Sequence, residues 1–277
     1  MRELAVPGAR LLIDTALGGR AISWHAAGHE LLAHHGDDAV EHGMYPMAPW
    51  AGRVRGNRVA STAGDFPLEV NYPPWAIHGT ALDKSMTVQS AETGSQRAEL
   101  HLRMDRRAAD GRWPWPMTVD VVWILEPRTL TTRITVTAED EEFPCVVGWH
   151  PWFRRRISGA SATWSIDAVG MLERDEHGLP AGWAEGRPEG SVDDAFLVPS
   201  GRATITWPSV VEVQVSADSE WFVVYDALPS ALCVEPQTGP PDGLVDHPWA
   251  ASHRARPGAP VTQQVTWTLR DLREDRA

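Results

Sequence analysis

The apolar residues of this chain fall in short runs of strand length that are separated by glycine and proline. Alternation of apolar and polar side chains is clearest in 131–137 and 261–269, where β-branched residues are frequent, as strands prefer. The chain contains 23 glycines and 22 prolines, and turns this frequent are typical of many-stranded antiparallel folds. No stretch has the period of a long amphipathic helix. We therefore predict an all-β fold, a large antiparallel β-sandwich of two sheets.

The runs that predict strands have ordinary strand lengths and are 10–14, 20–24, 30–34, 86–89, 98–104, 117–125, 130–137, 144–148, 162–168, 203–207, 210–216, 221–225 and 261–269. The chain has no repeated period, low-complexity linker or break in composition that would mark a second unit. All-β sandwiches reach this length as one domain. We expect residues 1–277 to form a single domain.

Charge and hydropathy limit the partners of the protein. The formal net charge of −12 argues against nucleic acid or an anionic membrane, because both require a basic surface. No apolar run approaches the roughly 18 residues of a membrane-spanning helix, and the early Pro7-Gly8 break interrupts any signal-peptide core. We expect a cytoplasmic protein, a monomer or homodimer, that binds a small neutral molecule.

The sequence gives no reason to expect a metal or an organic cofactor. Cys145 and Cys233 both lie beside valines in apolar segments, which predicts buried free thiols rather than a disulfide or a metal site. Five histidines gather near the start of the chain, namely His25, His29, His34, His35 and His42. Their spacing matches no tight ligand pattern.

Glu235 is the strongest candidate for chemistry. It follows the apolar run 232–234 and precedes Pro236, which restricts the preceding residue to extended geometry and withholds a backbone donor. We predict that a buried strand ends here and directs the carboxylate. Poor solvation of its ionised form makes Glu235 a candidate general base, although the same residues are compatible with a carboxylate that only hydrogen-bonds a loop.

Two histidines have related settings. We predict that a second apolar strand ends at His150, which precedes Pro151. The ring of His150 is then held in a fixed direction and can exchange protons near neutral pH. His78 precedes Gly79, which permits a close backbone approach. A satisfied structural histidine is the alternative for His78.

Arginines and aspartates supply further polar candidates. Arg53, Arg55 and Arg58 follow a Pro-Trp turn, and solvated strand positions are the alternative for Arg55 and Arg58. Asp193 and Asp194 are neighbours that would face opposite ways in a strand, so we expect only one of them to point into a site.

Taken together, these segments resemble the aldose 1-epimerases, or sugar mutarotases, whose fold is the galactose mutarotase-like supersandwich. The motifs that carry the resemblance occur in the family's order and are Pro49–Val54, His78-Gly79, Gly148–Phe153, Asp193 with Phe196, and Val234–Thr238. The chain departs from the family at Gly52, where members often carry Asn. Asp194 remains an alternative to Asp193.

The resemblance implies an isomerase that interconverts the α and β anomers of a free hexose such as galactose or glucose, without a cofactor. Glu235 would take the proton of the C1 hydroxyl while His150 donates to the ring oxygen. His78 would polarise or hold the ring-oxygen side, with Arg53 and Asp193 fixing sugar hydroxyls. Gln237 falls in the glutamate motif and is carried over as a substrate-binding residue.

The tryptophans divide into two predicted groups. Those beside the proposed site residues are expected to stack on the sugar, and they are Trp50, Trp75, Trp149 and Trp152. Those within strands are expected in the core, and they are Trp123, Trp207 and Trp267.

Two alternatives to a free hexose epimerase stay open. The first is a hexose-6-phosphate 1-epimerase, in which Arg55 or Arg58 grips the phosphate alongside Arg53. The second is a non-catalytic carbohydrate-binding sandwich, which would not need Glu235. A glycoside hydrolase is disfavoured because the acid partner of the glutamate is a histidine rather than a second carboxylate.

Overall fold

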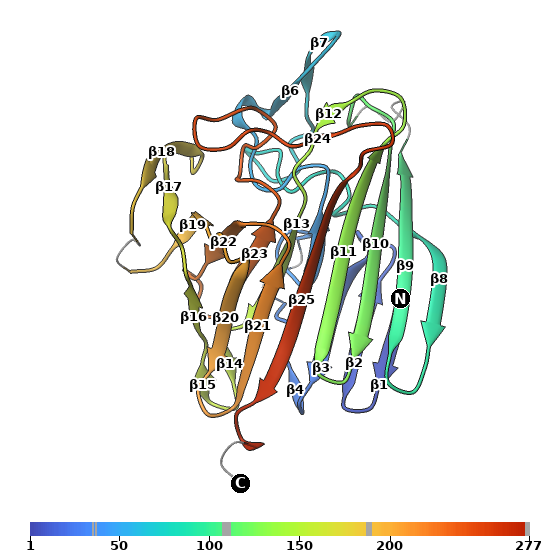
Figure 1. Ribbon diagram of the computed structural model, residues 1–277, viewed down its shortest axis with the longest axis vertical. Helices are drawn as coiled ribbons and strands as arrows, with labels where there is room; N and C mark the ends of the chain where they lie inside the picture. The colour runs from blue at the N-terminus through green and yellow to red at the C-terminus, as the bar shows by residue number, and fades with distance from the viewer. Residues whose placement is uncertain (35, 37, 107–111, 187–189, 275–277) are drawn as a thin grey trace.

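Two large antiparallel sheets lie face to face in the computed structural model (Figure 1), which describes residues 1–277 apart from 35, 37, 107–111, 187–189 and 275–277. Every strand pair within the two sheets is antiparallel. The one helix among the described residues is the short 3-10 turn η1, Arg55–Asn57. The predicted all-β antiparallel sandwich is confirmed.

The first sheet has eleven strands. In spatial order its path is β1 (Arg2–Val6), β2 (Ala9–Asp14), β3 (Arg20–Ala26), β5 (Met44–Met47), β13 (Gly148–Arg154), β23 (Ala231–Gln237), β22 (Trp221–Tyr225), β19 (Asp193–Leu197), β17 (Gly170–Arg174) and β18 (Pro180–Ala184), and β4 (His29–Glu30) pairs with β3. The strands at its centre are therefore drawn from segments far apart in the sequence.

The second sheet has eight strands. Its order is β16 (Thr163–Ile166), β20 (Arg202–Trp207), β21 (Val211–Ala217), β25 (Val261–Asp271), β11 (Thr129–Ala138), β10 (Met117–Glu126), β9 (Ala98–Arg106) and β8 (Thr87–Thr93). Three two-stranded pairs complete the fold: β12 (Phe143–Pro144) with β24 (Arg254–Ala255), β14 (Arg156–Ile157) with β15 (Ala160–Ser161), and β6 (Arg58–Ser61) with β7 (Gly64–Pro67).

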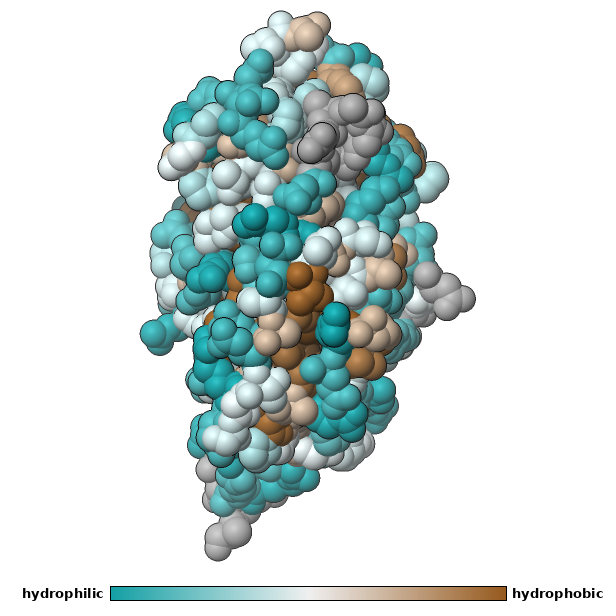
Figure 2. Space-filling model, turned by 90° about the vertical axis from the view of Figure 1, so that its right-hand side faces the viewer, coloured by the Kyte–Doolittle hydropathy of each residue, from teal (hydrophilic) through white to brown (hydrophobic). Residues whose placement is uncertain are grey.

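The core lies between the two sheets, because alternate side chains of each strand point inward. In β25 buried and exposed residues alternate along most of the strand, as its sequence predicts. Trp123, Trp207 and Trp267 are fully buried in the main cluster, which confirms them as core residues. From the side of β8 and β9, a seam of apolar atoms runs between hydrophilic flanks (Figure 2), where the edges of the two layers meet.

One predicted strand is divided. The run 144–148 contains the end of β12 and the start of β13, and the residues between them pair with loops instead of a ladder. The amide of Cys145 donates to the carbonyl of His253 at 2.8 Å, and that of Val146 donates to the carbonyl of Pro49 at 3.0 Å. Loop carbonyls therefore satisfy these buried donors.

The prediction that Pro236 and Pro151 end their strands is wrong. β23 continues to Gln237 and β13 to Arg154, and each keeps its pairing with the neighbour on its outer side, β22 and β5. The ladder between β13 and β23 instead omits residues 149–151 and 234–236. Both prolines lie within this gap, so their missing N–H groups interrupt one ladder without ending either strand.

Among the described residues, no helix is sufficiently long and apolar to span a bilayer.

Candidate active site

The first sheet carries a row of side chains across six of its strands, on the face that points away from the second sheet. Strand register places these residues level with one another, from β5 to β17: Tyr45, His150, Glu235, Val223, Ala195 and Leu172. All but Tyr45 line a cavity of about 240 Å³. The row therefore forms the floor of a pocket, with acid–base groups at one end and apolar groups at the other.

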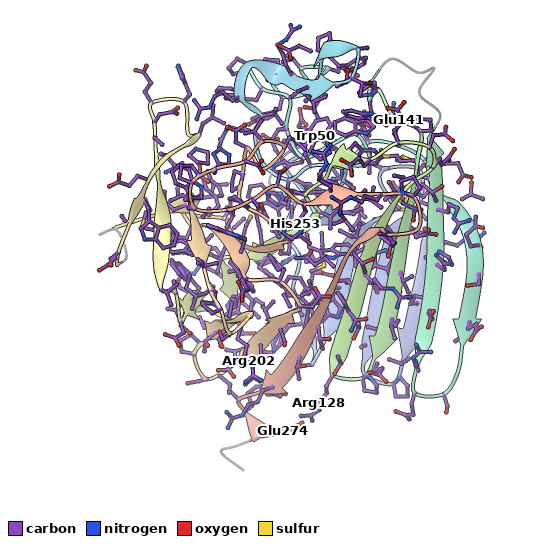
Figure 3. The ribbon with its side chains drawn as sticks, turned by 45° about the horizontal axis from the view of Figure 1, so that its top comes forward. Trp50, Arg128, Glu141, Arg202, His253 and Glu274 are labelled. Carbon is purple, nitrogen blue, oxygen red and sulfur yellow. The ribbon has the colours of Figure 1, made fainter. Side chains whose placement is uncertain are left out.

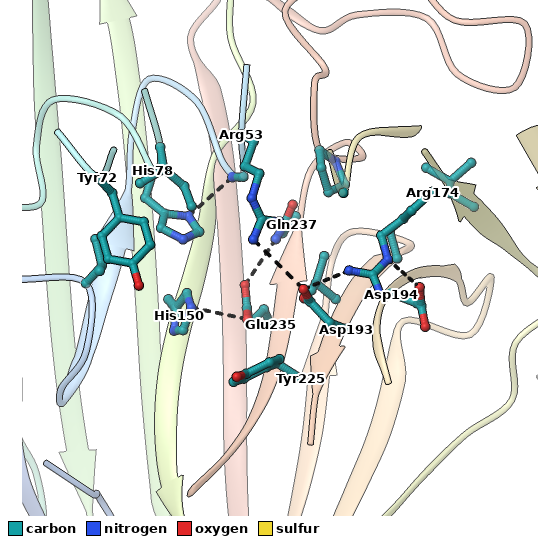
Figure 4. A pocket seen from close by; sticks show the side chains of 18 of the residues that line it. Arg53, Tyr72, His78, His150, Arg174, Asp193, Asp194, Tyr225, Glu235 and Gln237 are labelled. Atoms are coloured by element: carbon teal, nitrogen blue, oxygen red, sulfur yellow. Dashed lines mark hydrogen bonds and ion pairs between the residues drawn. The ribbon is translucent and has the colours of Figure 1, made fainter. Parts of the chain in front are cut away.

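The acid–base end holds His150 and Glu235 in contact. His150 Nε2 lies 3.3 Å from Glu235 Oε1, and both side chains are more than nine-tenths buried. The imidazole ring stacks on Tyr45 with centroids 4.8 Å apart and meets the edge of His78 at 4.9 Å. These rings hold His150 so that one nitrogen faces the carboxylate (Figure 4).

Burial favours the uncharged forms of these groups. It raises the pKa of Glu235 well above its usual value, and the nearby Asp193 carboxylate raises it further. Burial also lowers the pKa of His150 to about 3 and that of His78 well below its usual value, with His150 and Arg53 adding to the effect at His78. Perturbations of this size cluster at functional sites.

The backbone next to Arg53 holds His78 in place. The amide of Gly52 donates to His78 Nδ1 at 3.3 Å, so the ring proton of the neutral imidazole is on Nε2. His78 has a φ of +57°, and at Gly79 a Cβ would lie 2.0 Å from the carbonyl oxygen of Ala48. Only glycine fits there, which explains the His-Gly pair.

Arg53 and Asp193 face each other across the pocket, and a second arginine joins them (Figure 4). Arg174 donates to Asp193 from Nη1 and to Asp194 from Nε, both at 2.8 Å. Arg53 Nη2 lies 3.9 Å from Asp193 Oδ2. Both aspartates line the pocket, contrary to the expectation that only one would, because Arg174 draws both carboxylates to itself. The Asp193 side chain is 31% exposed and that of Asp194 is 10% exposed.

Gln237 lies two residues beyond Glu235 on the same face of β23. Its Nε2 donates to Glu235 Oε2 at 3.4 Å, and within the described part of the chain its buried Oε1 has no partner. Arg53 Nε and His150 Nδ1 are likewise buried without partners there. Buried polar atoms in this state are uncommon in proteins, and these three belong to residues that line one pocket.

Of the four tryptophans predicted to stack on a sugar, only Trp152 lines the pocket. Trp149 alternates with His150 along β13 and so points into the core, where its ring lies 4.7 Å from that of Trp123. Trp50 packs on Trp113 in the same core, with ring centroids 5.5 Å apart. Figure 3 labels Trp50 below the pale blue β6–β7 hairpin. The stacking prediction is therefore wrong for both.

Trp75 also lies outside the pocket lining. It is half-buried, and its ring contacts that of His177 at 6.0 Å between centroids.

Several lining residues were not predicted from the sequence. Arg174 is one, and its strand carries no motif. Tyr72 and Tyr225 are two more, and Tyr45 lies under His150 outside the lining. These are the chain's three tyrosines, and no local pattern in the sequence singled them out.

The arginines proposed to grip a phosphate lie elsewhere. Arg55 is bound to Asp242 and Asp175, and Arg58 lies near Asp65 on the β6–β7 hairpin. Neither lines the pocket, so the predicted grip beside Arg53 is wrong.

The histidines near the start of the chain do not form a metal-binding group among the described residues, and His35 lies outside those residues. One group of three potential ligands does occur in the described part, and it consists of His150, Cys233 and Glu235. Both cysteines are buried free thiols, as predicted.

Comparisons with known proteins bear on the family and the fold of the chain. The family model described as aldose 1-epimerase matches residues 13–266. No curated protein sequence matches the chain significantly.

Solved structures share the fold. A galactose mutarotase-like protein from Clostridium acetobutylicum has a TM-score of 0.84 at 16% identity, covering 97% of this chain and 94% of that one. Galactose 1-epimerase from Lactobacillus acidophilus has a TM-score of 0.77 at 16% identity, with coverages of 95% and 92%. A galactose mutarotase-like protein from Lactobacillus casei has a TM-score of 0.78 at 15% identity, with coverages of 98% and 100%. Because the family model matches most of its length, the chain belongs to the aldose 1-epimerase family.

Proposed function

We propose that the protein is an aldose 1-epimerase that interconverts the anomers of a free, neutral hexose such as galactose or glucose. The observation that carries this proposal is the pair formed by His150 and Glu235 at the floor of the pocket, with the two groups 3.3 Å apart. Anomer exchange needs one base and one acid near a single carbon atom. The pair supplies both.

The pair starts the reaction with one proton between its two members. Burial disfavours charge on either group, so the resting form is a protonated carboxyl beside a neutral imidazole. Transfer of this proton from Glu235 to His150 Nε2 creates the carboxylate base and the imidazolium acid. A sugar that seats its C1 hydroxyl on Glu235 stabilises that charged form by donating a hydrogen bond to it.

The chemical step then moves two protons. Glu235 takes the proton of the C1 hydroxyl while His150 gives its proton to the ring oxygen, and the bond between C1 and the ring oxygen breaks to give an open-chain aldehyde. Rotation about C1–C2 presents the other face of the carbonyl. The ring closes as Glu235 returns a proton to the aldehyde oxygen and His150 recovers one from the hydroxyl.

The remaining polar groups position the sugar. His78 carries its ring proton on Nε2 and can donate it to the ring-oxygen side. Arg53, Asp193 and Gln237 offer donors and acceptors for hydroxyls, and the unpartnered atoms of Arg53 and Gln237 gain partners when a sugar binds. Trp152 supplies the aromatic surface.

The charges of the lining favour a neutral sugar over a sugar phosphate. Among the described residues, the lining has two cationic side chains, Arg53 and Arg174, and both lie against Asp193. Asp194 and Glu235 add further carboxyls, and the low pKa of each lining histidine leaves it neutral. A phosphate dianion would meet no uncompensated positive charge, and its desolvation would be costly.

Anomer exchange measured by NMR tests the proposal directly. Wild-type protein is added to galactose, glucose and glucose 6-phosphate, beside Glu235→Gln and His150→Asn. We expect acceleration on a free hexose that both folded variants lose. Acceleration restricted to glucose 6-phosphate would favour the phosphate epimerase, and sugar binding without acceleration would favour a carbohydrate-binding module.

A further inference from the structure

A third potential ligand lies beside the acid–base pair. Cys233 occupies β23 two residues before Glu235, so its side chain leaves the same face of the strand. The register of β13 and β23 places it diagonally across from His150. Its Sγ, a ring nitrogen of His150 and a carboxylate oxygen of Glu235 all lie within 4.8 Å of one another.

The three ligand types match one class of metal ion. Thiolate, imidazole and carboxylate together bind zinc and its thiophilic relatives, whereas magnesium and calcium prefer oxygen alone. With bonds of about 2.0–2.3 Å, the ligand atoms of a tetrahedral zinc site lie roughly 3.3–3.6 Å apart. The observed separations, none above 4.8 Å, exceed this range by roughly 1.2 Å at most, which small side-chain rotations can supply.

The site is also closed on one side and open on the other. Cys233 is fully buried, while His150 and Glu235 line the pocket. A bound ion would thus have three protein ligands and a fourth position facing the cavity. Zinc sites with this arrangement hold water or another small ligand in the fourth position. The buried Nδ1 of His150 has no partner among the described residues, so no hydrogen bond from that nitrogen has to be broken when the other binds an ion.

We propose that His150, Cys233 and Glu235 form a binding site for one thiophilic divalent cation of the zinc and cadmium class, and that its occupancy inhibits the enzyme. Binding releases two protons to solvent, one from the thiol of Cys233 as it becomes a thiolate ligand and one from the carboxyl of Glu235 as it becomes a carboxylate ligand. The ion takes the base and the acid at once, so neither can exchange a proton with a sugar. The binding part stands without the proposed epimerase activity, whereas the inhibitory part rests on it.

Cadmium is the probe, because a cadmium–thiolate bond has a charge-transfer absorption in the ultraviolet. Cadmium chloride is titrated into the reduced wild-type protein, and heat is followed in parallel by calorimetry. We expect saturation at one equivalent, with the absorption rising in step. Zinc chloride should compete for the same equivalent.

The second cysteine gives a matched control. Cys145 is also a fully buried free thiol, but it lies in the main core. Cys145→Ala should keep the cadmium band and the affinity, whereas Cys233→Ala should lose the band and weaken binding at least about tenfold. Cys233→Ser, which keeps the size of the side chain, should behave as Cys233→Ala does.

Activity supplies an independent readout. One equivalent of zinc should abolish wild-type anomer exchange, a chelator should restore it, and the sugar should raise the zinc concentration needed. Absence of a charge-transfer band in wild type, or a band that persists in folded Cys233→Ser, would overturn the site. A band without inhibition would overturn only the inhibitory part, and binding in a protein that has no epimerase activity would separate the metal site from the proposed function.

Discussion

Glu235→Gln should lower activity and raise stability in the same molecule. The substitution keeps the shape of the side chain but removes the base. Loss of one positioned proton-transfer group typically costs about 10²–10⁴-fold in rate, which corresponds to about 2.7–5.4 kcal/mol of activation free energy. The loss should appear in kcat, because the proton transfer occurs in the transition state.

The stability change follows from burial. The folded-state pKa of Glu235 lies well above that of the unfolded chain, because burial and Asp193 disfavour its ionised form. Such a carboxyl stabilises the folded state fully only below the unfolded pKa, near pH 4, and this contribution is lost as the pH rises through the folded pKa. Each unit of difference costs about 1.4 kcal/mol at neutral pH. Glutamine removes this cost.

The assay pairs NMR anomer exchange with urea unfolding at pH 4 and pH 7. We expect the variant to be at least as stable as wild type at pH 7 and the difference to shrink at pH 4. Asp193→Asn serves as a comparison, since it removes the second contribution to the raised pKa while leaving the base in place. Retention of wild-type kcat by Glu235→Gln, or clear destabilisation at pH 7, would refute the reasoning.

Three further predictions concern the pH dependence of the pair, the role of Arg174 and two glycines near Arg53. The rate of anomer exchange should be constant over a middle range of pH and fall on both sides of it. On the acid side the pair gains a second proton near the His150 pKa of about 3, and on the alkaline side it loses its only proton at a pH above the usual carboxyl range. A rate that keeps rising with pH would contradict a shared proton. Arg174→Met should raise KM roughly 10–100-fold with little change in kcat. The substitution removes charged hydrogen bonds, worth about 1.5–3 kcal/mol, that position Asp193. A fall in kcat alone, measured by steady-state kinetics, would contradict this. Gly56→Ala should cost about 1–2 kcal/mol in urea unfolding, because its φ is +65° and space around it is open. Gly52→Ala should cost about 1–3 kcal/mol more, since its Cβ would also lie 2.8 Å from Pro241, and equal losses would rule out the close contact.

Local patterns in the sequence predicted the fold class and several polar residues of the site. Short alternating runs separated by glycine and proline are a property of the strands themselves, so the all-β sandwich could be predicted without knowing which strands pair. The alternation of side chains along β13 could also have been used. Once His150 is assigned to the pocket, the period of two places Trp152 beside it and Trp149 in the core, and this step would have prevented one error.

Long-range register could not be predicted in the same way. His150 and Glu235 meet because β13 pairs with β23, and nothing local to either segment specifies that pairing. Arg174 reaches Asp193 and Asp194 only because β17 pairs with β19. The prediction that Pro151 and Pro236 end their strands failed for a related reason. A missing N–H group interrupts pairing only with the neighbouring strand toward which it would point, and the sequence does not show which strand that is.

The order of strands in the two sheets has a consequence for synthesis of the protein. β23 lies between β13 and β22 in the first sheet, and β25 lies between β21 and β11 in the second. Each sheet thus receives an interior strand from the last fifth of the sequence. While a ribosome is still translating that region, both sheets have an open slot flanked by unpaired edges, which can recruit strands from other chains. The first sheet can close only after Gln237 has left the ribosome, and the second only after Asp271 has followed.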